Sequence, residues 1–337
     1  MDQYTGVLCD QLALWSDTLR TTADTLYFGG GTPSLMGGRR LAKIIETARR
    51  GFLLPDAEIT VEVNPVTPKL ESVLSLLSDA GVNRLSVGLQ SADETELSLL
   101  GRRHTPLDVI HTLNLARQVG IENLSLDLML GIPHQTRETL LRSISFCAQA
   151  DVSHVSAYLL KIEEDTPFYA QKAQLPLPDE DEEKELYLFA CAELEARGFM
   201  QYEISNFARS GRESAHNLHY WNAEPYLGLG PSAHAFVQGR RFYFPRDLAG
   251  FLRRPETVDD GEGGGMEEYA MLRLRLKDGL AESAFSARFG CAIPTIYRER
   301  MSTPELEALC CVDARGIRLT REGFLLSNLL IGRMLND

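Results

Sequence analysis

Apolar residues recur at helical spacing near the start of the chain and then gather in short runs. Leu8, Leu12, Trp15 and Leu19 are spaced by four, three and four residues, which predicts an amphipathic helix over residues 3–20. Five short apolar runs then predict strands at residues 25–28, 59–63, 84–89, 124–128 and 154–159. Helical patterns separate these runs, with apolar faces within residues 41–48, 70–77, 107–116 and 140–147. This alternation predicts βα units on a parallel sheet.

The number of βα units favours an α/β fold whose strands form a partial parallel barrel. The carboxyl ends of parallel strands meet on one rim, where the functional residues of such barrels gather. Four strand ends carry glycine or polar residues, namely Gly29–Thr32, Glu62 with Asn64, Gln90 and Asp127. We therefore expect Glu62, Gln90 and Asp127 to converge on the same mouth as Gly30 and Gly31.

The pattern changes after residue 165. An acidic run at residues 179–183 opens a further helix, because negative charge stabilises a helix N-terminus. Residues 201–206 have the pattern of a strand, and the glycine-rich residues 261–265 predict a flexible joint. We interpret the chain as three parts: a partial barrel at 1–170, an extension at 171–260 and a small helical, winged-helix-like domain at 261–337.

The composition is that of a globular protein. Of the 337 residues, 44% are hydrophobic and 24% are charged, which excludes a disordered or collagen-like chain. The formal net charge of −13 disfavours nucleic-acid binding and attachment to an anionic membrane surface, since both depend on positive charge. No apolar run reaches the roughly 18 residues of a transmembrane segment, and we expect a cytoplasmic protein.

The cysteines are scattered and form no C-x-x-C pair: Cys9, Cys147, Cys191, Cys291, Cys310 and Cys311. This usage predicts a reducing compartment in which thiols fill the core as small hydrophobic groups. Cys310 and Cys311 are adjacent in sequence, and neighbouring side chains rarely face the same way.

A glycine loop follows the first predicted strand. Gly29, Gly30 and Gly31 allow the backbone to approach a ligand closely, so the loop could bind a carboxylate, an amine or a phosphate. The spacing is neither that of a dinucleotide-binding loop nor that of a P-loop.

Three of the seven histidines lie within residues 216–234. The stretch HNLHYW, which starts at His216, combines imidazole groups with flat aromatic surface, and heme binding needs both an axial nitrogen donor and an apolar wall. A metal ion shared by His216, His219 and His234 is the alternative interpretation.

Specific motifs follow one another along nearly the whole chain: GGGTPS, VEVNP, SVGLQS, LGRRH, DLMLGIPHQT, SAYLLKIEEDTPF, YEISNFA, HNLHYW, YLGLGPSAHAF and IRLTREGFLLSN. In this order they resemble the HemN-like branch of the radical S-adenosylmethionine (SAM) family. That branch includes oxygen-independent coproporphyrinogen III oxidases and HemW-type heme chaperones. HNLHYW indicates the HemW type, whose members carry an H-N-x-x-Y-W heme-binding motif.

The resemblance implies a SAM site at the barrel mouth. It assigns the methionine amino group to the loop and further polar contacts to strand ends, through Gly30, Gly31, Thr32, Glu62, Gln90, Arg102 and Asp127. The assignment is chemically coherent, because carboxylates suit an ammonium group and a ribose diol, and arginine suits a carboxylate.

The resemblance also implies that His216 binds heme iron, with Asn217, Tyr220 and Trp221 in the same motif. The expected function is a heme-binding chaperone that delivers heme to apoproteins, with a homodimer left open. The alternatives are a coproporphyrinogen III oxidase-like radical SAM enzyme and a metal-dependent barrel hydrolase.

The chain departs from the family pattern in one respect. The family holds a [4Fe-4S] cluster through C-x-x-x-C-x-x-C after the first barrel strand, and this spacing is absent here. The opening helix has no strand before it, so we expect the first strand and the cluster loop to be missing by N-terminal truncation. Without the cluster, no radical cleavage of SAM is expected.

Overall fold

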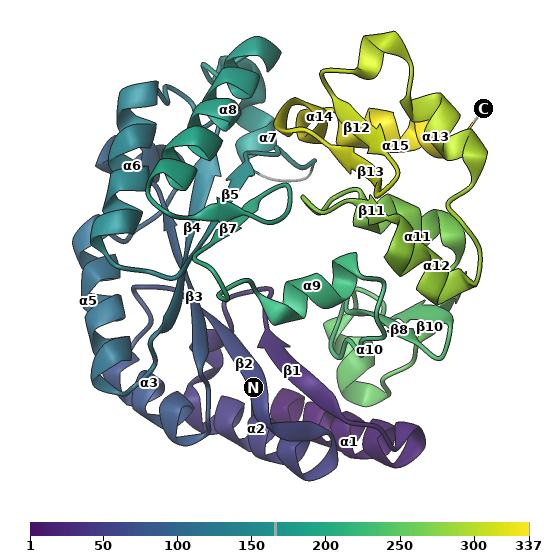
Figure 1. Cartoon of the computed structure of the whole chain (residues 1–337). Coiled ribbons are helices and arrows are strands. Elements are labelled where there is room, and N and C mark those ends of the chain that lie inside the picture. Colours follow the sequence, from purple (N-terminus) through teal and green to yellow (C-terminus); the bar gives the residue numbers. More distant parts are fainter. Residues whose placement is uncertain (165–166, 337) are drawn as a thin grey trace. The chain divides into compact units, whose positions relative to one another are not determined.

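The computed structural model describes residues 1–164 and 167–336, so the SAYLLKIEEDTPF motif crosses residues 165–166, which lie outside the described residues. The chain forms two compact units (Figure 1). The first is Met1–Met200 with Ser205–His216, and the second is Gln201–Ile204 with Asn217–Asp337. The division into three parts made from the sequence stays a prediction.

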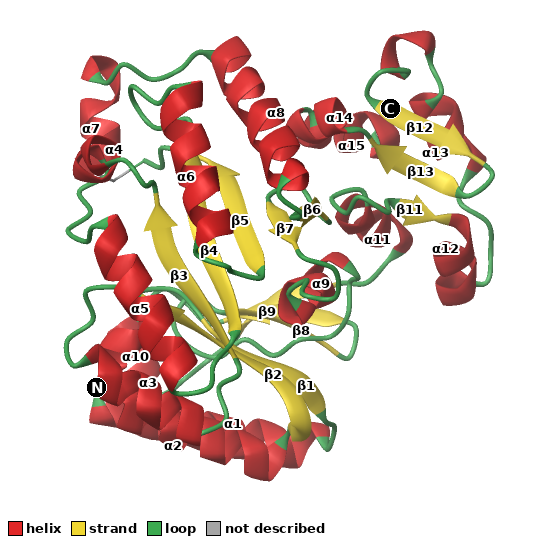
Figure 2. Ribbon diagram, turned by 60° about the vertical axis from the view of Figure 1, so that its left-hand side comes forward, coloured by secondary structure: helices red, strands yellow, loops and turns green. Residues whose placement is uncertain are grey.

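A seven-stranded sheet carries the first unit, in the order β1-β2-β3-β4-β5-β7-β6. The strands are β1 (Ala23–Phe28), β2 (Leu53–Val63), β3 (Arg84–Gln90), β4 (Asn123–Leu130), β5 (His154–Leu159), β6 (Met200–Gln201) and β7 (Asn206–Ala208). Strands β1 to β5 pair in parallel, and β7 runs antiparallel to β5. The sheet curls into a half-barrel (Figures 1 and 2), which confirms the predicted α/β partial barrel.

Helices cover the convex face of this sheet (Figure 1). They are α1 (Asp2–Leu19), α2 (Gly38–Gly51), α3 (Leu70–Asp79), α5 (Pro106–Gln118), α6 (Arg137–Gln149) and α8 (Glu180–Ala196). The first unit also contains the short helices α4 (Glu94–Leu99) and α7 (Pro167–Gln171) and the 3-10 turns η1 (Pro33–Met36) and η2 (Lys172–Gln174). Strand residues under the helices, such as Val87, Leu126 and Val155, are fully buried. These alternating apolar positions form the core of the unit.

The other, concave face of the sheet is polar. Side chains alternate along a strand, so Arg84, Ser86 and Gly88 share the face of β3 opposite to Leu85 and Val87. The same alternation continues on the neighbouring strands, where in-register residues present their side chains to the same face. Thr60 of β2 is paired with Arg84, and Ser125 of β4 is paired with Ser86. A continuous polar surface therefore crosses the inside of the half-barrel.

The buried face of α5 differs from the predicted one, which consists of Leu107, Ile110, Leu113 and Ala116. Leu107 is 79% exposed, whereas Val109, Leu113 and Ala116 are buried. Leu107 lies two residues before Val109, which is about 200° around the helix, so it faces away from the sheet. In α1, Leu8 and Leu12 are buried as predicted, but Trp15 and Leu19 are only half-buried.

The strand predicted at residues 201–206 is divided into β6 and β7. Between them, Ile204 donates its N–H to the carbonyl of Arg275 at 3.2 Å, and Tyr202 accepts from the N–H of Lys277 at 3.0 Å. These backbone bonds pair residues 201–204 with the second unit, so the segment changes partners where the pattern predicts one continuous strand.

The second unit contains two three-stranded sheets, in the orders β10-β9-β8 and β11-β13-β12. Its strands are β8 (His234–Val237), β9 (Arg240–Tyr243), β10 (Val258–Glu262), β11 (Leu280–Ala281), β12 (Cys310–Asp313) and β13 (Gly316–Leu319). Its helices are α9 (Ala215–Trp221, begun in the first unit), α10 (Leu248–Arg253), α11 (Met266–Arg273), α12 (Glu282–Phe289), α13 (Thr295–Met301), η3 (Pro304–Leu306), α14 (Arg321–Leu325) and α15 (Ser327–Leu335). The β12–β13 hairpin among short helices fits the predicted winged-helix-like outline.

The glycine-rich residues 261–265 are not the flexible joint that we expected. Glu262 belongs to β10 and pairs with Arg240 of β9, and Gly263 donates its N–H to the carbonyl of Gly239 at 2.9 Å. A Cβ atom on Gly264 would lie 2.8 Å from the ring of Phe236. Close packing, rather than flexibility, explains the glycine there.

The cysteines only partly follow the prediction of core filling. Cys147, Cys191 and Cys310 are buried, but Cys291 and Cys311 are exposed. Cys311 lies next to Cys310 on β12, so alternation sends one thiol inward and the other outward. In the described ranges, the helices are all too short or too polar to cross a membrane.

Candidate functional site

The glycine loop closes onto a carboxylate at the end of β2. Gly30 donates its N–H to Glu62 Oε2 at 3.2 Å, and Tyr27 donates its hydroxyl to Glu62 Oε1 at 2.9 Å. A Cβ atom on Gly29 would lie 2.7 Å from the ring of Tyr27, and Gly30 has φ +102°, so both positions require glycine. Burial raises the pKa of Glu62, although both hydrogen bonds act to lower it.

Asp127 lies on the same side of the sheet as Glu62. Ser86 donates its hydroxyl to Asp127 Oδ1 at 2.9 Å. Burial raises the pKa of Asp127 to about 6, and the nearby charge of Glu62 contributes to the increase. The charges of the two carboxylates therefore act on one another across β3, and the convergence of all the predicted residues on one mouth stays a prediction.

Gln90 ends β3 with an unusual backbone and an unsatisfied side chain. Its φ is +66°, and its side chain lies over Gly88, where a Cβ atom would come within 3.0 Å of Gln90 Nε2. Gln90 is buried, and among the described residues its Oε1 has no hydrogen-bond partner. A buried amide oxygen without a partner is costly, so it marks a place where a donor from a ligand fits.

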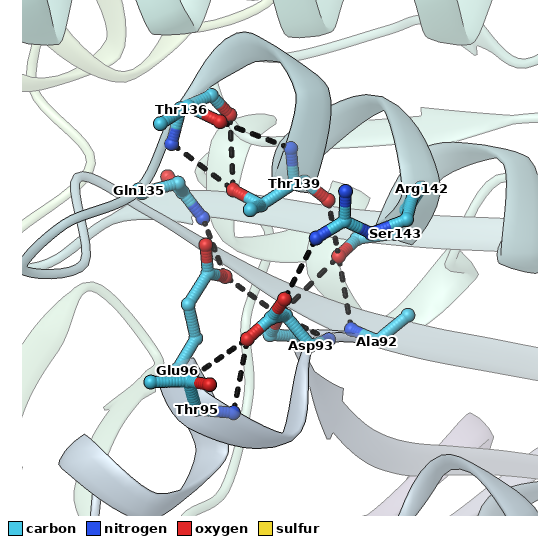
Figure 3. Close-up of polar contacts among 10 residues, drawn as sticks. Ala92, Asp93, Thr95, Glu96, Gln135, Thr136, Thr139, Arg142 and Ser143 are labelled. Atoms are coloured by element: carbon cyan, nitrogen blue, oxygen red, sulfur yellow. Dashed lines mark hydrogen bonds and ion pairs between the residues drawn. The ribbon is translucent and has the colours of Figure 1, made fainter.

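A polar network fixes the loops that follow β3 and β4 (Figure 3). Ser91 donates to the buried Glu96 Oε2 at 2.6 Å, and Gln135 donates to the same oxygen at 3.3 Å. Gln135 also accepts the N–H of Gly131 at 2.8 Å. Asp93 caps α4 and pairs with Arg142 of α6 at 2.7 Å. The network joins the SVGLQS and DLMLGIPHQT motifs, a role for Glu96 and Gln135 that the sequence analysis missed.

The remaining residues predicted for this mouth lie at its exposed edge. Thr32 has φ +40° and donates its N–H to the carbonyl of Gly30 at 2.9 Å, and Gly31 is exposed. Arg102 is exposed after α4, and its positive charge acts on the phenol of Tyr158 in β5. The structure therefore brings Gly30 and Glu62 into direct contact. Asp127 interacts with Glu62 through its charge, and Arg102 interacts with Tyr158 in the same way.

His216 lies against β1 and the neighbouring β2. Its Nδ1 is 2.8 Å from the hydroxyl of Thr25, and its ring stacks on Tyr27 with centroids 5.1 Å apart and planes at 20°. Glu58 accepts the backbone N–H groups of Ala215 and His216 at 3.3 and 3.2 Å. Thr25 and Tyr27 are two residues apart and so share a face of β1. That alternation is the signal that could have identified them from the sequence.

Tyr27 contacts both groups of residues. Its ring stacks on His216 and its hydroxyl binds Glu62, so one side chain connects the histidine motif to the glycine-loop carboxylate. Burial raises the pKa of Tyr27 strongly, and the charges of Glu62 and Asp127 raise it further. Tyr27 therefore remains a neutral hydroxyl donor.

The other histidines have different surroundings. His219 pairs through Nδ1 with Glu224, and His234 is exposed and stacks on Tyr243 at 5.2 Å. Across residues 1–164 and 167–336, no three His, Cys, Asp or Glu side chains are placed to hold a metal ion together. The alternative of a metal-dependent hydrolase built on His216, His219 and His234 is therefore not favoured.

The aromatic residues of the HNLHYW stretch are half-buried. Tyr220 packs edge-to-face with Tyr226 at 4.6 Å, and burial raises the pKa of Tyr220 to about 12. The guanidinium of Arg275 lies 5.8 Å from the ring of Trp221. Asn217 is half-buried on the same helix, α9.

Comparison with known families gives two matches. Residues 10–147 match the family described as the radical SAM superfamily, and residues 265–326 match the HemN C-terminal domain. The first match contains the glycine loop, Glu62, Gln90 and Asp127.

Individual relatives extend over nearly the whole chain. The heme chaperone HemW of Bacillus subtilis (strain 168) is 36% identical over 355 residues, covering 100% of this chain and 92% of that protein. The HemW of Lactococcus lactis (strain IL1403) is 31% identical over 322 residues, covering 93% and 85%. The structure of Escherichia coli coproporphyrinogen III oxidase (HemN), a radical SAM enzyme, matches with a TM-score of 0.83 at 21% identity, covering 99% and 82%.

Proposed function

The chain belongs to the HemW heme chaperone group of the radical SAM family, and from this premise we propose that it binds heme and delivers it to apoproteins. The observation that carries the proposal is the setting of His216, the first residue of the HNLHYW stretch. The enzymatic alternative, a coproporphyrinogen III oxidase-like activity, is not favoured, since the relatives named above that exceed 30% identity are heme chaperones.

His216 is held as an axial heme ligand needs to be held. Its Nδ1 is 2.8 Å from the Thr25 hydroxyl and its ring stacks on Tyr27, and we assign Nε2 to the heme iron. A hydrogen bond to the second ring nitrogen orients a ligand histidine and selects its tautomer. Heme supplies the iron as cargo, and the protein supplies the donor and its orientation.

Asn217, Tyr220 and Trp221 complete the proposed heme-binding motif. Tyr220 keeps its phenolic proton at neutral pH because its pKa is near 12, so it acts as a neutral aromatic group with a hydroxyl donor. Trp221 offers a large apolar surface. Their role in heme binding follows from the family motif and is tested below.

The mouth of the half-barrel is proposed to bind SAM through Gly30, Gly31, Thr32, Glu62, Gln90, Arg102 and Asp127. Two features fit such a ligand: the partnerless Gln90 Oε1 among the described residues, and the two carboxylates Glu62 and Asp127, whose charges act on one another. SAM would supply an ammonium and a ribose diol to these acceptors. Residues for a [4Fe-4S] cluster do not fit, because the chain has no C-x-x-x-C-x-x-C spacing, and we assign no radical step.

The partners are part of the proposal. They are heme and heme-accepting apoproteins, with a homodimer as one assembly to examine. A cytoplasmic location and the absence of nucleic-acid binding also remain predictions from composition.

A heme titration followed by the Soret band tests the proposal. We expect the parent to bind heme with a shifted Soret band and His216→Ala to lose at least tenfold in affinity, because the iron loses its nitrogen donor. His219→Ala should bind as the parent does, since His219 is paired with Glu224. His111→Ala, an exposed histidine on α5, is the matched control. Unchanged affinity and band position in His216→Ala would refute the assignment.

A further inference from the structure

Arg84 is the most unusual side chain of the first unit. It lies at the start of β3, and only 2% of its surface is exposed. Its Nε atom is buried and, among the described residues, has no hydrogen-bond partner. A buried charge without a partner is strongly unfavourable, so native proteins normally give it an anionic partner.

The atoms around Arg84 show the same deficit. Thr60, its in-register neighbour on β2, is fully buried, and its Oγ1 also has no partner in the part of the chain that the structure describes. Asn206 of β7, paired with Ser156, also has an Oδ1 atom without a hydrogen-bond partner within residues 1–164 and 167–336. Unsatisfied polar atoms therefore recur along one face of the sheet, which is the arrangement expected of a surface that receives a polar ligand.

Arg84 carries a positive charge on the concave face, and the neighbouring His154 does not add a second one. His154 is fully buried, and its pKa is lowered well below the ordinary value by burial and by the charge of Arg84, so it is neutral. Glu58 is already engaged by the N–H groups of Ala215 and His216. Glu62 and Asp127 lie farther toward the carboxyl ends of the strands, where Tyr27 and Ser86 donate to them. The charge of Arg84 acts on Asp127 and lowers its pKa, but no hydrogen bond or ion pair joins these two side chains among the described residues.

Strand pairing places Arg84 in the same row of residues as Tyr27, on which His216 stacks. Along β3, six residues separate Arg84 from Gln90, which corresponds to about 20 Å of strand. Across the sheet, Arg84 pairs with Thr60, and Thr60 pairs with Tyr27, the residue on which His216 stacks. Two strand spacings of about 4.8 Å therefore separate Arg84 from Tyr27 on one face.

We propose that Arg84, with Thr60, binds a propionate carboxylate of the heme whose iron is held by His216. Heme carries its iron at the centre of the ring and its carboxylates at the edge, which matches an imidazole and a guanidinium placed apart on one face. An arginine fork suits a carboxylate because two parallel N–H groups meet its two oxygens. The inference rests on the proposed function and adds how the edge of the cargo is recognised.

The test compares heme with heme dimethyl ester, whose propionates are uncharged, in titrations of the full chain. We expect the parent to bind heme roughly 10- to 100-fold more tightly than the ester, the range for a hydrogen bond to a charged group. In Arg84→Met this preference should vanish while the ester affinity and the Soret maximum stay as in the parent. Arg50→Met, which removes an exposed arginine of α2, should keep the full preference.

Two measurements decide the outcome without depending on the folding of Arg84→Met. The parent titrations involve no substitution, and Thr60→Val keeps the shape of its side chain and should reduce the preference for heme several-fold. Equal affinity of the parent for heme and its ester, or an unchanged preference in both variants, overturns the inference. Failure of the proposed function is distinct: the parent then binds neither compound, or His216→Ala binds both as tightly as the parent. A loss of SAM affinity in Arg84→Met, with the heme preference kept, would assign Arg84 to SAM instead.

Discussion

Asp127 illustrates how a position on the concave face of a strand changes the chemistry of one carboxyl group. Its position on the concave face of β4 removes water from it, and Glu62 places a second negative charge nearby, so its pKa rises from 3.8 to about 6. The hydroxyl of Ser86 opposes this shift but does not cancel it. A carboxyl group with this pKa changes its charge near pH 6.

The folded protein should bind a proton at Asp127 more tightly than the unfolded chain does. Because the folded pKa lies above the unfolded one, the free energy of unfolding should fall as the pH rises from about 4 to 6, by at most about 3 kcal/mol. Partial exposure of Asp127 to solvent reduces this value. Asp127→Asn should lose this pH dependence, which urea denaturation of both proteins between pH 4 and 7 measures. Identical slopes in the two proteins would contradict the shift.

At the scale of elements, the strands follow from sequence alone and their inner face does not. The alternation of Leu85, Val87 and Leu89 with polar residues fixes β3 and its buried side. The same alternation places Arg84 on the concave face. Nothing in the sequence shows that its Nε atom lacks a hydrogen-bond partner among the described residues, because its surroundings come from the neighbouring strands β2 and β4. The spacing of Leu107 with Ile110 and Leu113 predicts that Leu107 is buried, whereas the buried face in the structure passes through Val109.

Long-range partners explain the other differences. Residues 201–206 have the pattern of a strand, yet backbone bonds to Arg275 and Lys277 divide it, and such pairing leaves no local signal. In the candidate site, Glu62, Gln90 and Asp127 could be predicted because each lies at or near the end of a short apolar run in the sequence, although β4 continues past Asp127 to Leu130. Tyr27 was missed as a contact, since its link between Glu62 and His216 joins residues distant in sequence.

The N-terminus of α4 offers a test of how the site loops are fixed. Asp93 accepts the N–H groups of Thr95 and Glu96 at 2.9 and 3.3 Å and also pairs with Arg142 (Figure 3). Asp93→Ala removes the cap and the ion pair and should lower the free energy of unfolding by about 1–2 kcal/mol. Arg142→Met removes only a partly exposed ion pair and should cost less than about 1 kcal/mol. Urea denaturation compares the two, and equal losses would show that the cap contributes nothing.

At the scale of the molecule, the chain has the fold of the radical SAM family but not the C-x-x-x-C-x-x-C cysteines that bind the family's [4Fe-4S] cluster. Relatives align with nearly the whole chain, and the half-barrel contains the glycine loop and the carboxylates Glu62 and Asp127. Its cysteines do not follow the spacing of the family's cluster motif. Cys147 of α6 and Cys191 of α8 are buried, and Cys310 donates its thiol to the carbonyl of Met301 at 3.0 Å. The proposed heme binding through His216 needs none of these thiols. Heme binding and cluster assembly can therefore be examined separately.

Anaerobic reconstitution with iron and sulfide tests this separation. A [4Fe-4S] cluster of this family needs three converging thiolates, whereas burial raises the pKa of Cys147 strongly and keeps that thiol protonated. We therefore expect no stoichiometric four-iron cluster by iron analysis and visible absorption, while heme still shifts its Soret band in the same preparation. Cys291→Ser with Cys311→Ser removes both exposed thiols and should abolish any residual adventitious iron. One cluster per chain that persists in this double variant would contradict the prediction, since it would require buried thiols to converge.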